Sequence, residues 1–203
     1  ALVWGGAGIL CFGQAAFFGL GAYTYAVAAM NLGDSTYAIL LGMLVPSLFA
    51  LALGYFMFMG RLSELYIGVI TLSVSLILFN FMNSTSDPRY TIGVAPLNGF
   101  NGMSSIPSFN MPFDPSAILS PTQVFYVTMV SLMITYALIK YTMASTYGRI
   151  VASVRENEVR AELLGYNVAV VKLGIFVMGA AIAGYAGCLF VNWNGFVSPH
   201  VFS

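Results

Sequence analysis

The chain has 203 residues, of which 59% are hydrophobic and 7% charged, and its formal net charge at pH 7 is zero. A typical soluble domain carries roughly 25% charged residues, so this composition excludes a water-soluble globular protein. The zero net charge argues against nucleic acid as a partner. Two cysteines in apolar runs and a single histidine argue against a disulfide or a metal site, and we expect no metal and no cofactor.

The first apolar segment, residues 1–31, is too long for one straight crossing of a bilayer. As a continuous helix it would measure about 46 Å, against a hydrocarbon core of about 30 Å. Gly13 precedes Gln14, the strongly polar side chain in the middle of the segment. Non-helical backbone at membrane depth is tolerated where protein or a water-filled path covers it. We therefore predict a break at Gly13–Gln14 that lines a pore; the alternative is that the glycines only allow close helix packing.

Two further spans are predicted at 36–60 and 66–82. Asp34 can cap the start of the first one, and Pro46 should kink it. Hydroxyl side chains can bond back to their own helix, so in the second of these spans we expect only Asn80 to demand a partner outside it.

The long connection 83–121 is rich in proline and glycine, and connections of this length are usually functional or disordered. Four aromatic residues predict a packed loop rather than a disordered one. These are Tyr90, Phe100, Phe109 and Phe113.

The last two spans are predicted at 122–143 and 170–193. Gly179, Ala183 and Gly187 recur every four residues in the second of them. Small residues at this spacing allow two helix backbones to approach closely within lipid.

Eight of the 14 charged residues lie between Lys140 and Lys172. Helical spacing within this stretch predicts one amphipathic helix at 149–164, with Ile150, Val154, Ala161 and Leu164 near its apolar face. Two ion pairs are expected on its polar side, Glu156 with Arg160 and Arg155 with Glu158. Gly165 suits the helix end, and Asn167 should open the next turn. The helix either lies on the membrane surface or is gripped by a soluble partner.

Basic residues predict the orientation. Six of the seven lie in the turn at Arg61 and in the 140–172 stretch, whereas the turn at Asp34 and the 83–121 loop carry one arginine and three aspartates. The positive-inside rule places the first two regions in the cytoplasm. The 83–121 loop would then face outward.

Three separate motifs carry a resemblance to a known family. They are GQAAFFGLGAY at 13–23, the stretch 147–167 with its YGR, RENE and RAELLGYN tokens, and VSP at 197–199. Together they resemble permeases of the branched-chain amino-acid ABC importer family over most of the chain. The stretch from Glu162 to Gly165 is similar to the EAA loop of importer permeases, with Leu163 and Leu164 in place of small residues.

The resemblance implies a multi-pass permease of the bacterial inner membrane, with about five spans here and further spans beyond both ends. The partners implied are a second permease subunit, cytoplasmic ATP-binding subunits, a periplasmic substrate-binding protein and membrane lipid. Within one transmembrane domain, 1–203, it makes 83–121 a periplasmic loop and 144–169 a cytoplasmic coupling loop.

We expect no catalytic residue, because the chain has no Walker A pattern. The expected substrate pathway comprises Gly13, Gln14, Phe17, Phe18 and Asn80. The residues expected to couple to the ATP-binding subunits are Arg155, Glu156, Asn157, Glu158, Arg160, Glu162 and Gly165.

Three alternatives stay open at this point. The importer could carry urea or short-chain amides, because those permeases share the motifs. The chain could instead be a passive channel for a small neutral solute, or a structural membrane subunit without a pore.

Overall fold

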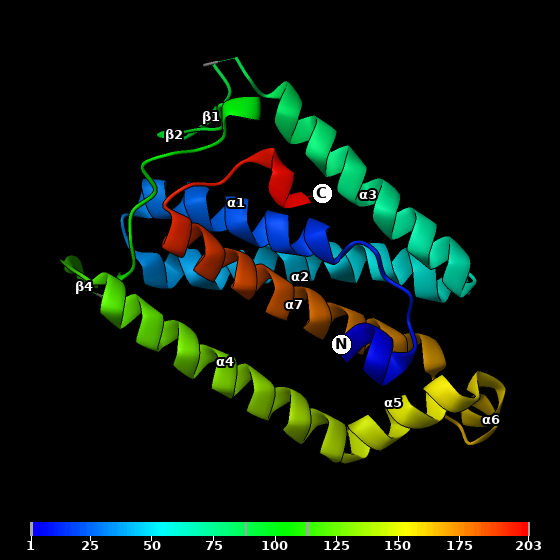
Figure 1. Ribbon diagram of the computed structural model, residues 1–203. Coiled ribbons are helices and arrows are strands. Elements are labelled where there is room, and N and C mark those ends of the chain that lie inside the picture. The colour runs from blue at the N-terminus through cyan, green and yellow to red at the C-terminus, as the bar shows by residue number, and fades with distance from the viewer. Residues whose placement is uncertain (1, 88, 113, 203) are drawn as a thin grey trace.

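The computed structural model describes residues 2–87, 89–112 and 114–202, and it is dominated by long helices (Figure 1). Five helices in the described part are long and apolar enough to cross a membrane. They are α1 (Gln14–Leu32), α2 (Ser35–Met59), α3 (Glu64–Ser84), α4 (Pro121–Ala144) and α7 (Val168–Asn194). The predicted all-α membrane protein with about five spans is confirmed.

Polar side chains at the helix starts explain where several spans begin. The Asp34 carboxylate accepts from the backbone N–H of Thr36 at 2.8 Å and caps α2, as predicted. The Ser120 hydroxyl and the Gln123 side chain form a reciprocal capping box at the start of α4. Asn167 accepts from the backbone N–H of Val170 and caps α7. These caps hold the chain where it turns back at each end of the bundle.

Helices α1, α2 and α7 lie side by side and form the centre of the molecule (Figure 1). They approach so closely that a Cβ at Gly184 of α7 would lie 2.6 Å from the carbonyl oxygen of Gly42 in α2. Gly21 of α1 likewise lies against the backbone of Gly184. The predicted role of small residues on α7 in close packing is therefore confirmed.

Aromatic side chains fill the remaining space in this three-helix core. Phe17 of α1 is buried and meets Phe176 of α7 edge to face, with ring centroids 5.3 Å apart. Phe58 of α2 contacts the same Phe176 ring at 5.6 Å. Such edge-to-face pairs add stability beyond the area that they bury.

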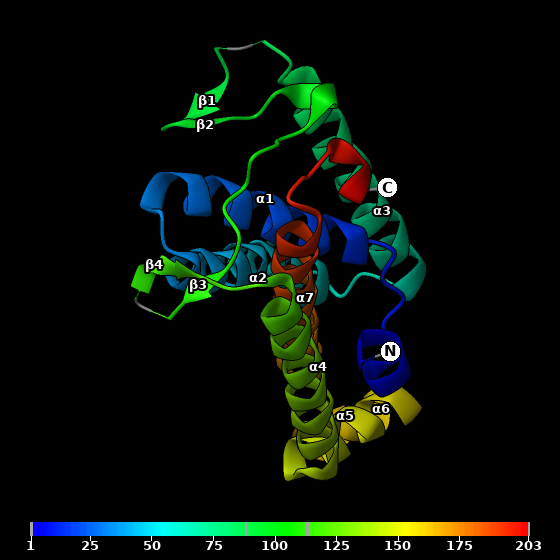
Figure 2. The same cartoon turned by 60° about the vertical axis from the view of Figure 1, so that its left-hand side comes forward.

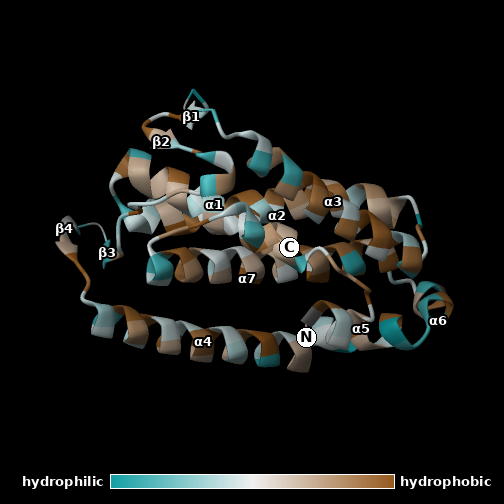
Figure 3. Ribbon diagram, turned by 45° about the horizontal axis from the view of Figure 1, so that its top comes forward, coloured by the Kyte–Doolittle hydropathy of each residue, from teal (hydrophilic) through white to brown (hydrophobic). Residues whose placement is uncertain are grey.

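Helices α3 and α4 lie on the outside of this core (Figure 2). Helix α3 packs on the short helix Pro199–Phe202 and the broken start of the chain, while Val124 and Ser131 are the buried residues of α4. Both helices expose many large apolar side chains, as expected for surfaces in contact with a bilayer. Figure 3 shows hydrophobic colour along these long helices and hydrophilic colour at the ends of the bundle.

The 85–120 connection folds into two small hairpins, visible at one end of the bundle in Figure 1. Strand β1 (Thr91–Ile92) pairs with β2 (Ala95–Pro96), a short helix follows at Gly99–Asn101, and β3 (Asn110–Met111) pairs with β4 (Asp114–Ile118).

Side-chain hydrogen bonds fasten these hairpins to the bundle. The Asn31 amide of α1 donates to the carbonyl of Ile92 at 2.8 Å and accepts from the N–H of Val94 at 3.0 Å. The Asn110 amide donates to Asp34 at 3.2 Å. The predicted packed loop is therefore ordered by polar contacts more than by rings.

Of the aromatic residues expected to pack this loop, only Phe109 is buried among those that the structure describes. Tyr90 and Phe100 are exposed, and Phe113 lies outside the described residues.

The first apolar segment is broken where the sequence predicts. A short π-helix at Leu2–Gly6 is followed by irregular backbone, and α1 begins at Gln14. We call residues 2–13 the broken segment. The N–H of Phe12 donates to the Thr71 hydroxyl of α3 at 3.2 Å, and a Cβ at Gly13 would lie 2.8 Å from the carbonyl oxygen of Thr71. At Phe12 and Gly13, contacts with Thr71 thus satisfy and cover the non-helical backbone just before α1.

The charged stretch forms two helices, α5 (Thr146–Glu156) and α6 (Glu158–Leu163), so the prediction of one helix at 149–164 is wrong. The break is at Asn157, whose backbone is extended and whose side chain accepts from the N–H of Arg160 at 2.9 Å. An asparagine that caps a new helix is more stable there than in a helix interior.

Because the axis turns at Asn157, neither predicted ion pair forms among the described residues. Leu164, expected on the apolar face, is exposed, whereas Val154 and Ala161 are buried as expected. Gly165 has a φ of +88° and ends α6 in the left-handed region, as predicted.

Candidate functional site: a polar cleft and an amide at the helix break

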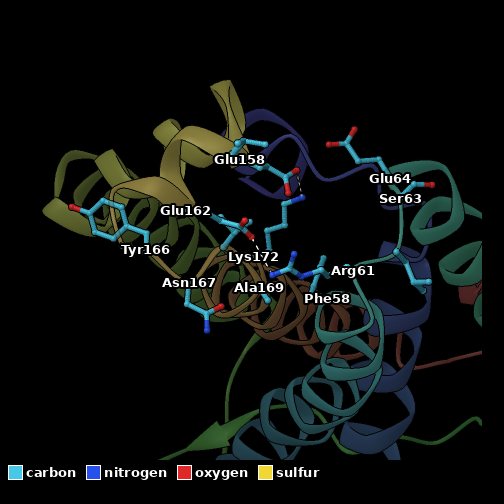
Figure 4. Close-up of a pocket in the computed structure, with 14 residues that line it drawn as sticks. Phe58, Arg61, Ser63, Glu64, Glu158, Glu162, Tyr166, Asn167, Ala169 and Lys172 are labelled. Carbon is cyan, nitrogen blue, oxygen red and sulfur yellow. Dashed lines mark hydrogen bonds and ion pairs between the residues drawn. The ribbon is translucent and has the colours of Figure 1, made fainter.

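A polar cleft of about 700 Å³ lies at the α5–α6 end of the bundle, between the α2–α3 turn and the α6–α7 connection. Its walls carry five charged residues that come from three parts of the chain: Arg61, Glu64, Glu158, Glu162 and Lys172. Figure 4 shows the Arg61 side chain reaching toward Glu162, and Lys172 toward Glu158. In a chain with 14 charged residues, this is a strong local concentration of charge.

The Lys172–Glu158 ion pair ties α6 to α7. The Lys172 ammonium lies 2.5 Å from a Glu158 carboxylate oxygen, and Lys172 is only 8% exposed. A buried cation is costly unless it is paired and hydrogen-bonded. Glu158 therefore holds the start of α6 against α7.

The Arg61–Glu162 pair closes the other side of the cleft. The guanidinium nitrogen and the carboxylate oxygen are 3.6 Å apart, and both side chains are well exposed. Exposed pairs of this kind contribute roughly 0–1 kcal/mol. This contact therefore links the α2–α3 turn to α6 without locking it.

Helix α5 is attached to α7 by a tyrosine. The Tyr147 hydroxyl donates to the carbonyl of Val171 at 3.0 Å. Burial raises the pKa of the Tyr147 phenol, so the group stays protonated and able to donate at neutral pH.

The outer face of α6 and the turn after it is exposed. Val159, Leu163 and Leu164 present apolar side chains to the surroundings, and Leu163 is 83% exposed. Glu156 and Arg160 flank them, with no side-chain ion pair among the residues that the structure describes. An exposed apolar patch with a charged rim is typical of a protein-binding surface.

A second, smaller cavity of about 370 Å³ lies at the break in the first segment. Gln14 lines it together with apolar residues of the broken segment and of α7 and with Ile139 of α4. Among the residues that the structure describes, the Gln14 amide donates only to the sulfur of Cys11, at 3.8 Å. An amide with a single weak intramolecular partner is a polar group available to a solute.

The structure brings only Gly13 and Gln14 of the expected pathway residues together at this break. Phe17 belongs to the three-helix core, and Phe18 lines a different cavity of about 510 Å³ beside Asn194. Asn80 lies on the exposed side of α3, and its amide donates to the carbonyl of Leu76 at 2.9 Å. The expectation that Asn80 needs a partner outside its own helix is therefore wrong.

The expected coupling residues divide into four groups. Glu158 and Glu162 line the cleft, Asn157 and Gly165 shape the backbone, and Glu156 and Arg160 point outward. Arg155 instead reaches the broken segment. The sequence did not identify Arg61 and Lys172 as partners in the cleft. One signal could have found them: the turn at Arg61 and the 140–172 stretch are both rich in basic residues and were predicted to lie on the same side of the membrane.

A bundle of five membrane-length helices, preceded by a break at a half-buried glutamine and carrying a charged cleft at one end, has the architecture of a multi-pass membrane permease. The family model described as "Branched-chain amino acid transport system / permease component" matches residues 1–203, and the chain belongs to that family.

Two curated relatives carry the name high-affinity branched-chain amino acid transport system permease protein LivM. The protein from Escherichia coli (strain K12) is 27% identical over 232 residues, and the one from Salmonella typhimurium is 28% identical over the same length. Each alignment covers 100% of this chain and 50% of the relative, so the chain spans about half the length of the relatives it matches. No solved structure matches the chain.

Proposed function

We propose that the chain forms the translocation path of an ATP-driven importer for branched-chain amino acids in the bacterial inner membrane. It would pair with a second permease subunit and receive substrate from a periplasmic binding protein. Cytoplasmic ATP-binding subunits would drive it, and the chain itself would hydrolyse nothing. The family match over the whole chain is the observation that carries this proposal.

The exposed face of α6 supports the docking of a soluble partner. Its apolar side chains are bordered by charges of both signs, and the cleft behind it is closed by contacts to two other elements. A partner that grips this face would move α5 and α6 relative to the bundle. If α5 and α6 lie in the cytoplasm, the hairpins of the 85–120 loop face the periplasm. The distribution of basic residues agrees with this orientation.

The Gln14 cavity supports a path for a zwitterionic or neutral polar solute. It combines one amide with apolar walls, and neither α1 nor α2 carries a charged side chain. Strong binding inside the membrane would slow release, so a weakly polar path suits an importer whose specificity resides in a separate binding protein.

Reconstitution tests the function directly. The chain with its partner subunits in liposomes should accumulate leucine, isoleucine or valine only with ATP and the binding protein. Accumulation of urea or short amides instead would change the substrate class. Solute flux through the chain alone, without ATP-binding subunits, would favour a passive channel and contradict the proposal.

Charge reversal in the cleft tests the coupling. Glu162→Lys should abolish ATP-driven uptake while the protein still inserts, because α6 would be repelled from Arg61 and from its partner. Asp87→Lys makes a comparable change in the loop at the opposite end of the bundle and should transport normally. Normal uptake by Glu162→Lys would defeat the coupling assignment.

Removal of the amide tests the path. Gln14→Leu should change the transport rate without changing assembly, whereas Asn80→Leu, on the exposed side of α3, should have little effect. If Gln14→Leu leaves the transport rate unchanged, Gln14 is not part of the path.

A further inference from the structure

The side chain of Arg155 connects α5 to the broken segment. Arg155 lies in the last turn of α5, and its Nη1 donates to the carbonyl oxygen of Gly5 at 2.6 Å. Gly5 lies near the end of a short helix, where carbonyl groups lack partners within the helix. A hydrogen bond from a guanidinium to such a carbonyl is charge-assisted and therefore stronger than a neutral one.

The aliphatic part of the same side chain packs on the broken segment. A Cβ at Gly8 would lie 3.2 Å from the Cγ of Arg155, and Gly8 has a φ of +71°. The absence of a side chain at position 8 therefore leaves room for the arginine to lie flat over the backbone.

Apolar packing joins the same two elements. Val151 of α5 is fully buried in a cluster that includes Val3, Ala7 and Ile9 of the broken segment. The contact between α5 and the broken segment is thus both polar and apolar, and it joins regions about 150 residues apart in the sequence.

The broken segment in turn forms one wall of the Gln14 cavity. Val3, Trp4, Ile9 and Cys11 line that cavity together with the α7 residues Gly179 and Ala183, and Val3 lies directly against Gly179. A movement of α5 that carries Arg155 with it would shift this wall directly. Helix α4, which leads into α5, also reaches this cavity through Ile139 and lies near Gly6 through Met143, but its buried residues, Val124 and Ser131, lie in its first half, away from α5.

We infer that Arg155 is a positioning residue that passes movement of α5 and α6 to the broken segment, and so to the wall of the Gln14 cavity. This inference rests on the proposed function. It gives Arg155 a role inside the permease, whereas the sequence-based expectation was contact with the ATP-binding subunits.

The experiment uses the assembled transporter and the thiol of Cys11 as a reporter. The background variant Cys188→Ala removes the other cysteine of the chain, which is buried in the core. In this background, ATP should change the rate at which a small maleimide labels Cys11. Arg155→Met, which keeps an unbranched apolar stem and removes the donors, should retain ATP hydrolysis within about twofold while lowering uptake at least about tenfold. Its Cys11 labelling should no longer respond to ATP.

Arg160→Met is the matched control, because Arg160 lies on the outer face of α6. It should weaken binding of the ATP-binding subunits and lower hydrolysis and uptake together. If Arg155→Met behaves in this way, Arg155 is a docking residue and the inference is overturned while the proposed function stands. If ATP changes neither uptake nor labelling in the background chain, the proposed function fails and the inference falls with it.

Arg155→Lys is a second variant for the case in which Arg155→Met does not assemble. It keeps the positive charge and can still donate to the Gly5 carbonyl, so uptake and the ATP response of Cys11 should largely return. The inference would be overturned if Arg155→Lys assembles and hydrolyses ATP but shows the low uptake and the unchanging Cys11 labelling expected of Arg155→Met.

Discussion

The three-helix core and the charged cleft hold their elements together to different extents. In the core, α1, α2 and α7 meet through glycines and rings, and the contacts lie within the membrane-length helices. At the cleft end, α5 and α6 are attached by single polar contacts of Tyr147, Arg155, Glu158 and Glu162 and by a few buried apolar side chains such as Val151 and Val154. The first region depends on close packing along whole helices, and the second on a small number of polar and apolar contacts.

This difference indicates which region can move. Close-packed helices resist small displacements because each van der Waals contact weakens steeply with distance. Polar contacts at the margin can be exchanged for water or for a partner's side chains. The core is therefore suited to be the fixed frame, and α5 with α6 the part that a partner displaces.

The largest effect should follow from adding one methyl group to the core. Gly184→Ala places a Cβ against Pro46 and the carbonyl of Gly42, and overpacking of this kind costs about 1–3 kcal/mol. The melting temperature in detergent should fall clearly. Gly5→Ala, where nothing lies within 4 Å of the added Cβ, is the matched control and should melt like the unsubstituted protein. Equal melting temperatures of the two variants would mean that α2 and α7 can move apart at Gly184 without loss of stability.

A smaller effect should separate the two ion pairs of the cleft. Glu158→Gln leaves the buried Lys172 without its counter-ion, and we expect a loss of about 1–2 kcal/mol, below that for a fully buried pair because Glu158 is half exposed. Glu162→Gln breaks an exposed pair and should cost less than about 0.5 kcal/mol. Denaturation in mixed micelles would measure both. A larger loss of stability for Glu162→Gln than for Glu158→Gln would show that the Arg61–Glu162 pair contributes more than the Lys172–Glu158 pair, contrary to this prediction.

The cap between α5 and α6 should matter by a similar or smaller amount. Asn157→Ala removes the acceptor for the N–H of Arg160 and should cost about 1 kcal/mol. Asn157→Asp retains an acceptor and should be close to neutral. Backbone amide exchange of residues 158–163 would report the change, with faster exchange expected only in the alanine variant.

The smallest effect should appear on acidification at the opposite end. Hydrogen bonds, chiefly the one from the Thr36 backbone, hold the pKa of Asp34 below its ordinary value of 3.8. Its stabilising contribution is therefore complete above that value and is lost as the pH falls through the lowered pKa. Melting temperatures from pH 7 to pH 3 should show a late acidic decline that is reduced in Asp34→Asn. An equal decline in both proteins would assign it to other carboxylates.

The spans could be predicted from the sequence because their signals are local. Hydropathy, with Asp34 as a cap, placed one span at 36–60, and hydropathy alone placed another at 122–143, close to the observed Ser35–Met59 and Pro121–Ala144. The break before Gln14 was likewise visible, since a segment too long for the bilayer must interrupt its helix near its glycines and its polar residue.

The site was predicted less well because its contacts are not local. Helical spacing paired Arg155 with Glu158 on one helix. In the structure, Arg155 instead contacts Gly5, and Glu158 contacts Lys172. The helix axis turns at Asn157 because this residue caps α6 and does not continue α5. The spacing of apolar residues alone does not predict which of these two positions an asparagine takes. Phe17 was expected in the pathway, but its ring belongs to the core.

The confinement of charge to the two ends of the bundle has an electrical consequence. Helices α1 and α2 contain no charged residue, α3 has Glu64 as its first residue, and Lys140 and Lys172 lie near the ends of α4 and α7. Moving one elementary charge through the full transmembrane voltage involves about 2.3 kcal/mol per 100 mV. A rearrangement of this bundle would carry almost no such charge across the field, so its rate should be the same in energised and de-energised membranes.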